Sequence, residues 1–180
     1  MQKNKISIAR AVTLVGLMTA TLECGKLVLS ALPNVEVITL LTALYGYVFG
    51  PLGIIASILF VMIEPLIWGF NLWVVSYFLY WPPLAFIFMM LGGAKVKNRF
   101  LLTAIAILLT AWFGVLTSLV DIGLFTGNFD NFFTRFGIYY ARGIWFYITQ
   151  VVTNAVLFPL LFPILSDTLG KLKEKFLIKK

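Results

Sequence analysis

Four long stretches of the chain carry no charged side chain, and they constrain the fold more than any other feature. They cover residues 37–63, 65–94, 100–120 and 143–166, which are 27, 30, 21 and 24 residues long. A helix needs about 20 consecutive apolar residues to cross the hydrocarbon core of a bilayer, so each stretch is long enough to cross. The strict alternation of apolar and polar residues that marks a membrane β-barrel is missing from the sequence. The sequence therefore predicts an all-α integral membrane protein.

The number of crossings depends on how residues 37–63 are divided. As a single helix they give five crossings, and the basic clusters at 95–99 and after residue 170 would then face outwards. That arrangement contradicts the excess of Lys and Arg on the cytoplasmic side of membrane proteins. A break at Gly50-Pro51 instead gives six crossings and places 11 of the 14 Lys and Arg residues inside. Proline suits a break because it removes a backbone donor and restricts the residue before it.

We therefore expect six transmembrane helices in a single membrane domain, with both termini in the cytoplasm. The expected helices lie at about residues 8–31, 35–49, 52–68, 72–93, 100–125 and 137–165. Prolines within the fourth and sixth of these helices are expected to bend them. Residues 166–180 combine apolar side chains with lysines, which is typical of a short helix that lies on the inner membrane surface.

Several ionisable, amide and aromatic side chains fall in the outer halves of these helices or in the outer loops. An ionised group inside a membrane is costly, so such groups usually face a cavity or a partner. Glu23 and Lys26 are three residues apart on one helix and can form an ion pair. The candidate substrate-binding residues are Glu23, Lys26, Asn34, Glu36, Glu64, Trp68, Asn71, Tyr77, Tyr80, Trp81, Asp121, Arg142, Tyr147, Gln150 and Asn154.

These candidates also have purely structural interpretations. Glu23 and Lys26 could simply neutralise each other, and Gln150 and Asn154 could join two helices through their amides. Tyr77 and Trp81 lie four residues apart on one helix face, deeper than an interfacial aromatic belt. A concave, aromatic-lined cavity with a few convergent polar groups is the usual form of a small-molecule site. The convergence of these residue types at one depth therefore favours a ligand-binding cavity on the outer side.

The inner half of the first helix has a different character. Ala9, Thr13, Gly16 and Ala20 recur at helical spacing and form a ridge of small side chains. Such a ridge lets another helix approach closely, either from the same chain or from a separate subunit. We treat these four residues as a candidate partner-docking surface.

Enzymatic chemistry is not indicated. The chain has no histidine, so the commonest general base and a common metal ligand are missing. Its Gly-Lys pairs lack the surrounding residues of a nucleotide-binding loop. We therefore expect no enzyme activity, no metal site and no cofactor. We also expect no nucleic-acid partner, because the net charge of +7 comes mainly from the basic clusters predicted on the cytoplasmic side.

Several motifs together resemble the S-components of energy-coupling factor (ECF) vitamin transporters. They are Gly16–Ala20 with Glu23 and Lys26, LPNVE at 32–36, TLLTALYGYVFG at 39–50 and EPLIWGFNLW at 64–73. The resemblance covers about residues 8–93. It implies a six-helix protein of the bacterial cell membrane that binds a vitamin on the outer side.

The resemblance also implies partners and a ligand. In this family a small-residue AxxxA motif on the first helix, matched here by Gly16-x-x-x-Ala20, docks on the transmembrane subunit EcfT. EcfT in turn carries two ATPase subunits, which would supply the missing nucleotide site. The PNVE-type sequence is most similar to members linked to corrinoids, so cobalamin is the favoured ligand. Dimethylbenzimidazole, a queuosine precursor, riboflavin and a folate stay open, as do a stand-alone channel or carrier and a structural subunit without a ligand.

Overall fold

The computed structural model describes residues 7–32, 35–126 and 130–176, and these form six α-helices and one π-helical turn without any strand. The elements are α1 (Ile8–Leu29), α2 (Ile38–Phe49), α3 (Pro51–Trp68), α4 (Trp73–Gly93), α5 (Arg99–Val120), η1 (Asp121–Thr126) and α6 (Phe132–Phe176). Among these, α1, α3, α4, α5 with η1, and α6 provide five helices long and apolar enough to cross a membrane. The prediction of an all-helical chain with several helices that could cross a membrane is confirmed, whereas six crossings with cytoplasmic termini stay a prediction. The 12-residue α2 spans only about 18 Å, which is shorter than the hydrocarbon core.

The helix break expected at Gly50-Pro51 is present. Gly50 has a φ of 62°, a left-handed conformation that glycine adopts without a Cβ clash. Pro51 is the first residue of α3, where its missing N–H would have no helical partner in any case. One turn along α3, a Cβ on Gly53 would clash with the backbone of Tyr45. Glycine at both positions therefore allows α2 and α3 to fold back tightly on each other.

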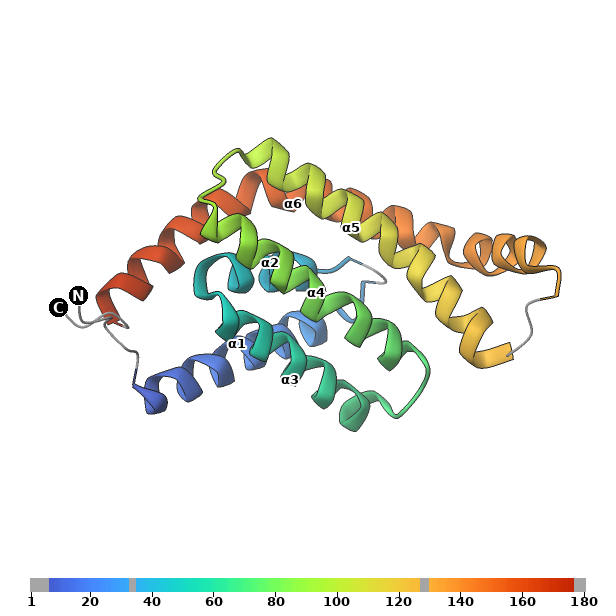
Figure 1. Cartoon of the computed structure of the whole chain (residues 1–180), viewed down its shortest axis with the longest axis horizontal. Helices are drawn as coiled ribbons and strands as arrows, with labels where there is room; N and C mark the ends of the chain where they lie inside the picture. Colours follow the sequence, from blue (N-terminus) through green and yellow to red (C-terminus); the bar gives the residue numbers. More distant parts are fainter. Residues whose placement is uncertain (1–6, 33–34, 127–129, 177–180) are drawn as a thin grey trace.

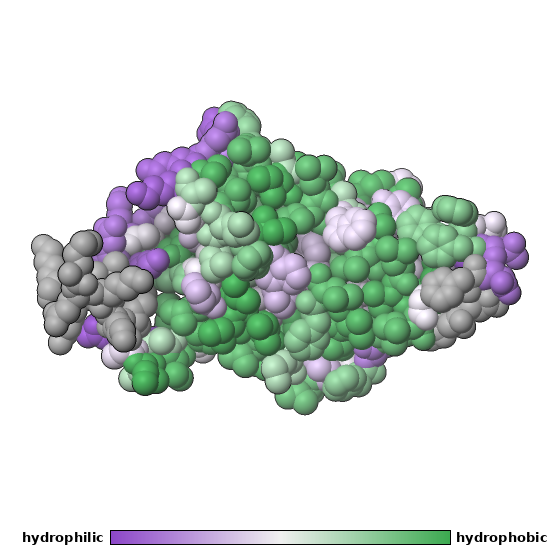
Figure 2. Space-filling view, viewed as in Figure 1, coloured by the Kyte–Doolittle hydropathy of each residue, from purple (hydrophilic) through white to green (hydrophobic). Residues whose placement is uncertain are grey.

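The helices alternate in direction between two ends of the molecule (Figure 1). We call the end where α1 begins and α6 ends the terminal end; the α2–α3 and α4–α5 connections also lie there. The α3–α4 connection and η1 lie toward the opposite end, which we call the distal end. On the face drawn in Figure 2, apolar residues cover most of the middle and the strongly hydrophilic residues gather toward the two ends. This distribution is what a bilayer around the middle of the bundle would require.

Helix α2 lies at the centre of the bundle. Ten of its twelve residues are buried, and it packs against α3, α4 and α6. Close contact with α4 depends on Gly46, because a Cβ there would clash with the backbone of Ala85. Toward the terminal end, the Phe88 ring of α4 packs on Phe158 and Phe162 of α6, with centroid distances of 5.8 and 5.6 Å. The bundle thus has a solid apolar core in its terminal half.

Helix α6 is longer than expected. The sequence suggested a membrane helix at 137–165 followed by a separate surface helix, but α6 runs without interruption for 45 residues through Pro159 and Pro163. Its last turns are held against the bundle, because Leu169 packs on the core and Lys173 donates a hydrogen bond of 2.6 Å to the Val48 carbonyl oxygen. A helix of this length spans about 68 Å, so part of it must extend beyond a bilayer core of about 30 Å.

Candidate functional site

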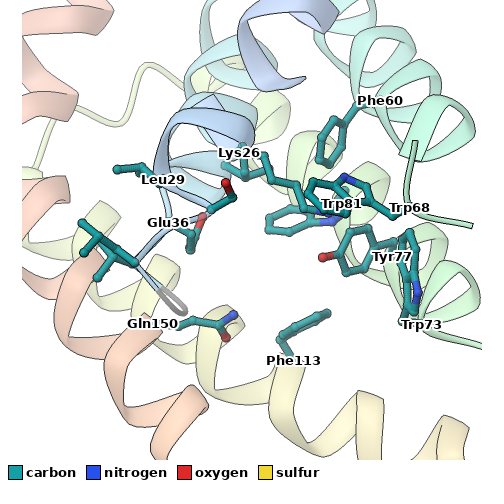
Figure 3. Close-up of a pocket in the computed structure, with 14 residues that line it drawn as sticks. Lys26, Leu29, Glu36, Phe60, Trp68, Trp73, Tyr77, Trp81, Phe113 and Gln150 are labelled. Atoms are coloured by element: carbon teal, nitrogen blue, oxygen red, sulfur yellow. The ribbon is translucent and has the colours of Figure 1, made fainter. Parts of the chain in front are cut away.

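A cavity of about 390 Å³ lies toward the distal end, and we call it the aromatic cavity (Figure 3). All six α-helices contribute to its wall, together with the connection between α1 and α2. The lining residues are Lys26, Leu29, Ser30, Leu32, Val35, Glu36, Ile38, Phe60, Trp68, Trp73, Tyr77, Trp81, Phe113 and Gln150. Six of these fourteen residues are aromatic, and only Lys26, Glu36 and Gln150 carry a charged or amide group.

Side chains from distant parts of the sequence converge on this space. Figure 3 shows Lys26 from α1, Glu36 from the α1–α2 connection and Tyr77 from α4 on one side of the cavity. Phe113 from α5 and Gln150 from α6 reach it from the other side. The Gln150 side-chain oxygen is buried without a hydrogen-bond partner among the described residues. The cavity therefore presents an unused polar group beside flat apolar walls.

The ammonium group of Lys26 is the positive centre of the wall. It forms an ion pair with Glu64 of α3, whose side chain is completely buried. It also lies 5.5, 5.3 and 5.1 Å from the ring centroids of Trp68, Trp73 and Tyr77. These distances are within the ~6 Å at which a cation is attracted to an aromatic face. Lys26 is therefore held by one carboxylate and a cage of three rings.

Glu23 takes a different place from the one expected. The sequence suggested an ion pair between Glu23 and Lys26, one turn apart on α1, but Lys26 pairs with Glu64 instead. Glu23 is buried and lies close to both groups. Within the described chain, neither of its oxygens has a hydrogen-bond partner apart from the facing carboxyl group of Glu64. Sequence spacing gave the helix face correctly but could not reveal that α3 supplies a second acid.

Beneath the cavity, a polar network fixes the Glu36 carboxylate. One oxygen accepts a 2.8 Å hydrogen bond from the Thr39 backbone N–H, which caps the start of α2. The other accepts a 2.8 Å bond from the side-chain amide of Asn154, which also donates to the Thr110 hydroxyl oxygen at 3.2 Å. Asn154 is completely buried, so it joins α6 to α5 and to the start of α2 and orients Glu36 without lining the cavity.

The candidate residues separate into groups by position. Lys26, Glu36, Trp68, Tyr77, Trp81 and Gln150 line the cavity. Glu23, Glu64, Tyr80 and Asn154 are buried next to these residues. Asn34 lies outside the described residues. The remaining candidates, Asn71, Asp121, Arg142 and Tyr147, do not line the cavity.

Local packing explains the positions of these last four residues. Asn71 is exposed in the α3–α4 connection and accepts a hydrogen bond from the Leu72 N–H. Tyr147 packs over Gly114 of α5 and shares a 3.1 Å hydrogen bond with Thr117. Arg142 is exposed against the Tyr139 ring, and Asp121 opens η1. Hydropathy predicts the depth of these residues in a membrane, but depth alone does not specify which way a side chain points.

Other lining residues were not among the candidates. Trp73 could have been found, because it begins the stripe that continues through Tyr77 and Trp81 at four-residue spacing. Phe60 and Phe113 carry no such signal, since each is one apolar residue within an apolar helix. The others belong to the α1–α2 region, whose path over the cavity depends on tertiary packing: Leu29, Ser30, Leu32, Val35 and Ile38.

The predicted docking ridge lies away from the aromatic cavity. Ala9, Thr13, Gly16 and Ala20 are all exposed, and a Cβ on Gly16 would meet nothing within 4 Å. Near the terminal end is a second cavity of about 440 Å³, which we call the aliphatic groove. It is lined by Ala9, Arg10, Thr13, Leu14, Leu17, Phe49, Leu169, Leu172 and Lys173. Two residues of the ridge, Ala9 and Thr13, are thus also part of the groove.

Comparison of the chain with protein-family models, with curated proteins and with solved structures finds no match. In the ranges that the structure describes, no three His, Cys, Asp or Glu side chains gather in a way that could hold a metal ion. The functional assignment therefore depends on the geometry of the cavity, the exposed ridge and the sequence motifs.

Proposed function

We propose that the chain is the substrate-binding membrane subunit, or S-component, of an ECF importer in a bacterial cell membrane. In this proposal it binds a vitamin or vitamin precursor on the outer side, docks on EcfT, and releases the ligand inside when two partner ATPase subunits hydrolyse ATP. The observation that carries the proposal is the aromatic cavity, where charged and amide groups converge on apolar walls at one end of a membrane bundle.

The core beneath the cavity supports a binding subunit over a channel or stand-alone carrier. A polar solute crossing the chain alone would need polar groups along the full depth of the bundle. Phe88, Phe158 and Phe162 are instead packed together between the cavity and the terminal end, and all three are buried. Release toward the inside would then need a rearrangement that a partner provides.

The exposed ridge on α1 supports a docking role. Gly16 and Ala20 are exposed on a helix that packs mainly on α3, and a Cβ on Gly16 would meet nothing within 4 Å, so this part of the ridge is open to a partner. Small side chains allow a neighbouring helix to approach closely in a membrane. EcfT is the partner that the sequence motifs suggest.

The cavity volume bears on the choice of vitamin. Small-molecule sites that enclose a drug-sized ligand measure about 300–1,000 Å³, and the aromatic cavity is at the lower end of this range. A corrinoid is several times larger than such a ligand and would protrude from a cavity of this size. Cobalamin is therefore one member of the panel to test, beside smaller vitamins and precursors.

Identification of the small molecule that copurifies with the protein tests the proposal directly. The full-length chain would be purified in detergent, extracted with organic solvent and analysed by mass spectrometry. Titration calorimetry with the vitamin panel would follow. We expect one ligand to bind tightly at one molecule per chain. Absence of any ligand would contradict the proposal, and solute flux through the chain alone in liposomes would favour a channel or carrier.

A matched pair of variants connects the binding to the cavity. Gln150→Leu removes a cavity-lining amide whose buried oxygen has no hydrogen-bond partner among the described residues, so stability should stay unchanged. If the ligand uses that amide, its affinity should fall about tenfold. Thr149→Val is the control, because Thr149 precedes Gln150 on α6 without lining the cavity and donates only to the Trp145 carbonyl oxygen of its own helix. Equal affinities in both variants would place the ligand elsewhere.

A further inference from the structure

The charged groups around the aromatic cavity are not balanced. Glu23, Glu36 and Glu64 all lie close enough to Tyr77 to interact with it electrostatically. Among the described residues that line the cavity, Lys26 is the only basic one. Of these acids only Glu36 lines the cavity, whereas Glu23 and Glu64 are buried beside it; the three together outnumber the one lining base, and this excess of acid favours a positively charged ligand.

The one base is already engaged. Lys26 is paired with the buried Glu64 and surrounded by Trp68, Trp73 and Tyr77. An anionic ligand would have to share the Lys26 ammonium group with Glu64, so one positive charge would face two negative ones. A cationic ligand meets no such obstacle, because it could neutralise Glu64 in place of Lys26.

The three rings form a preorganised site for a cation. Trp73 contacts Tyr77 edge-on with ring centroids 4.8 Å apart, and Tyr77 contacts Trp81 in the same way at 5.8 Å. These contacts fix two of the three ring faces around the Lys26 ammonium group, those of Trp73 and Tyr77. Lys26 itself sits on a flexible chain and its side chain is 26% exposed, so it can move from the cage toward solvent.

The rest of the wall favours a flat ligand. Phe60, Trp81 and Phe113 are close to one another, with the Trp81 ring centroid 6.2 Å from that of Phe60 and 6.1 Å from that of Phe113. Aromatic walls of this kind favour planar rings that stack or meet them edge-on.

We propose that the ligand of the aromatic cavity is a planar heterocyclic cation whose positive group takes the place of the Lys26 ammonium between Trp68, Trp73 and Tyr77, beside Glu64. This inference rests on the proposed function and narrows its substrate class. It makes Lys26 a tethered substitute that keeps the cage and Glu64 occupied while the ligand is absent. Lys26 then moves toward solvent when the ligand enters.

The test uses probes of one shape and three charges. The purified full-length chain in nanodiscs would be titrated calorimetrically with 1,3-dimethylbenzimidazolium, a permanent cation, with the neutral isostere 1,3-dimethylindole, and with 1-methylindole-3-carboxylate as the anion. We expect the cation to bind at least about tenfold more tightly than the neutral probe, as cation–π contacts and a carboxylate would allow. Equal or tighter binding of the neutral or anionic probe, or no measurable binding of the cation, would overturn the inference.

Two variants locate the charge preference within the cavity. Lys26→Met removes the competing ammonium group and should strengthen binding of the cation, whereas a site for anions would lose its ligand. Glu64→Gln keeps the shape of the side chain. It should lower the affinity for the cation by about tenfold and leave the affinity for the neutral probe unchanged. If the vitamin panel yields a tight neutral or anionic ligand, the inference fails and the proposed function stands. If neither the panel nor the probes bind, the proposed function fails as well.

Discussion

The two cavities described above are close in volume, about 390 and 440 Å³, but different kinds of side chain line them. The aromatic cavity has rings on most sides and has Lys26, Glu36 and Gln150 in its wall. The aliphatic groove is lined mainly by leucines and small residues, with Arg10 and Lys173 as its charged members. Rings in mutual contact give fixed walls, and convergent polar groups give orientation. Volume alone therefore does not distinguish a ligand site from a contact surface, whereas rigidity and polar convergence do.

Helix α1 takes part in both regions and shows the same contrast along its length. In its distal half Leu22 and Glu23 are buried, and Lys26 reaches into the aromatic cavity. In its terminal half Thr13 and Gly16 are exposed. One helix can thus present a binding residue at one end and a smooth surface at the other. The first of the following predictions tests whether these two roles are separate, and the others test the packing at each end of the bundle.

The largest expected effect is the loss of uptake in Gly16→Leu. The side chain would project from an open surface, so folding and ligand affinity should stay unchanged, but a partner helix could no longer approach closely. We expect uptake of the ligand into cells or proteoliposomes that contain the partner subunits to fall to background. Titration calorimetry on the isolated chain should give the wild-type affinity.

Gly137→Leu is the matched control, because Gly137 is also an exposed helical glycine at which an added Cβ would meet nothing within 4 Å. It lies near the start of α6, away from the ridge. Uptake should be normal in this variant. Normal uptake in Gly16→Leu would contradict the contrast between the two halves of α1, since the terminal half would then have no docking role.

A smaller effect is expected for the polar network that supports the aromatic cavity. Asn154→Leu removes the donor to the half-buried Glu36 and the bond to the buried Thr110, and should lower the free energy of unfolding by about 2 kcal/mol. Reversible unfolding in mixed micelles would measure this change in the free energy of unfolding. Thr168→Val on the same helix is the control, because Thr168 is exposed and should change stability by less than about 0.5 kcal/mol. Equal losses would mean that the network contributes nothing specific.

Sequence patterns were sufficient for the main features of the fold because a membrane restricts what a chain can do. Charge-free runs predicted the long helices, and the Gly50-Pro51 step predicted where α2 and α3 separate. The continuous α6 was missed, because its last turns are held by Lys173 and Leu169 against a distant part of the chain. Contacts of this kind leave no periodic signal in the sequence.

The sequence predicted those site residues whose side chains cost free energy to place in a membrane, because such residues are conspicuous in an apolar helix. Lys26, Glu36 and Gln150 stand out in apolar surroundings and do line the cavity. Phe60 and Phe113 resemble every other apolar residue of their helices, so only the packing of α3 and α5 reveals them. The exchange of partners at Lys26, from the expected Glu23 to Glu64, likewise depends on how α1 and α3 meet.

The smallest expected effect concerns the terminal end, where Lys173 combines electrostatics with packing. Its ammonium group donates to the Val48 carbonyl oxygen in the last turn of α2, a group that the helix itself leaves without a partner. A cation at a helix C-terminus contributes about 0.3–1 kcal/mol, so Lys173→Met should lower the free energy of unfolding by about that amount. Lys171→Met, two residues away and exposed, should leave it unchanged. Equal stabilities of the two variants would mean that the basic residues here set only the orientation in the membrane, and the continuation of α6 would need another cause.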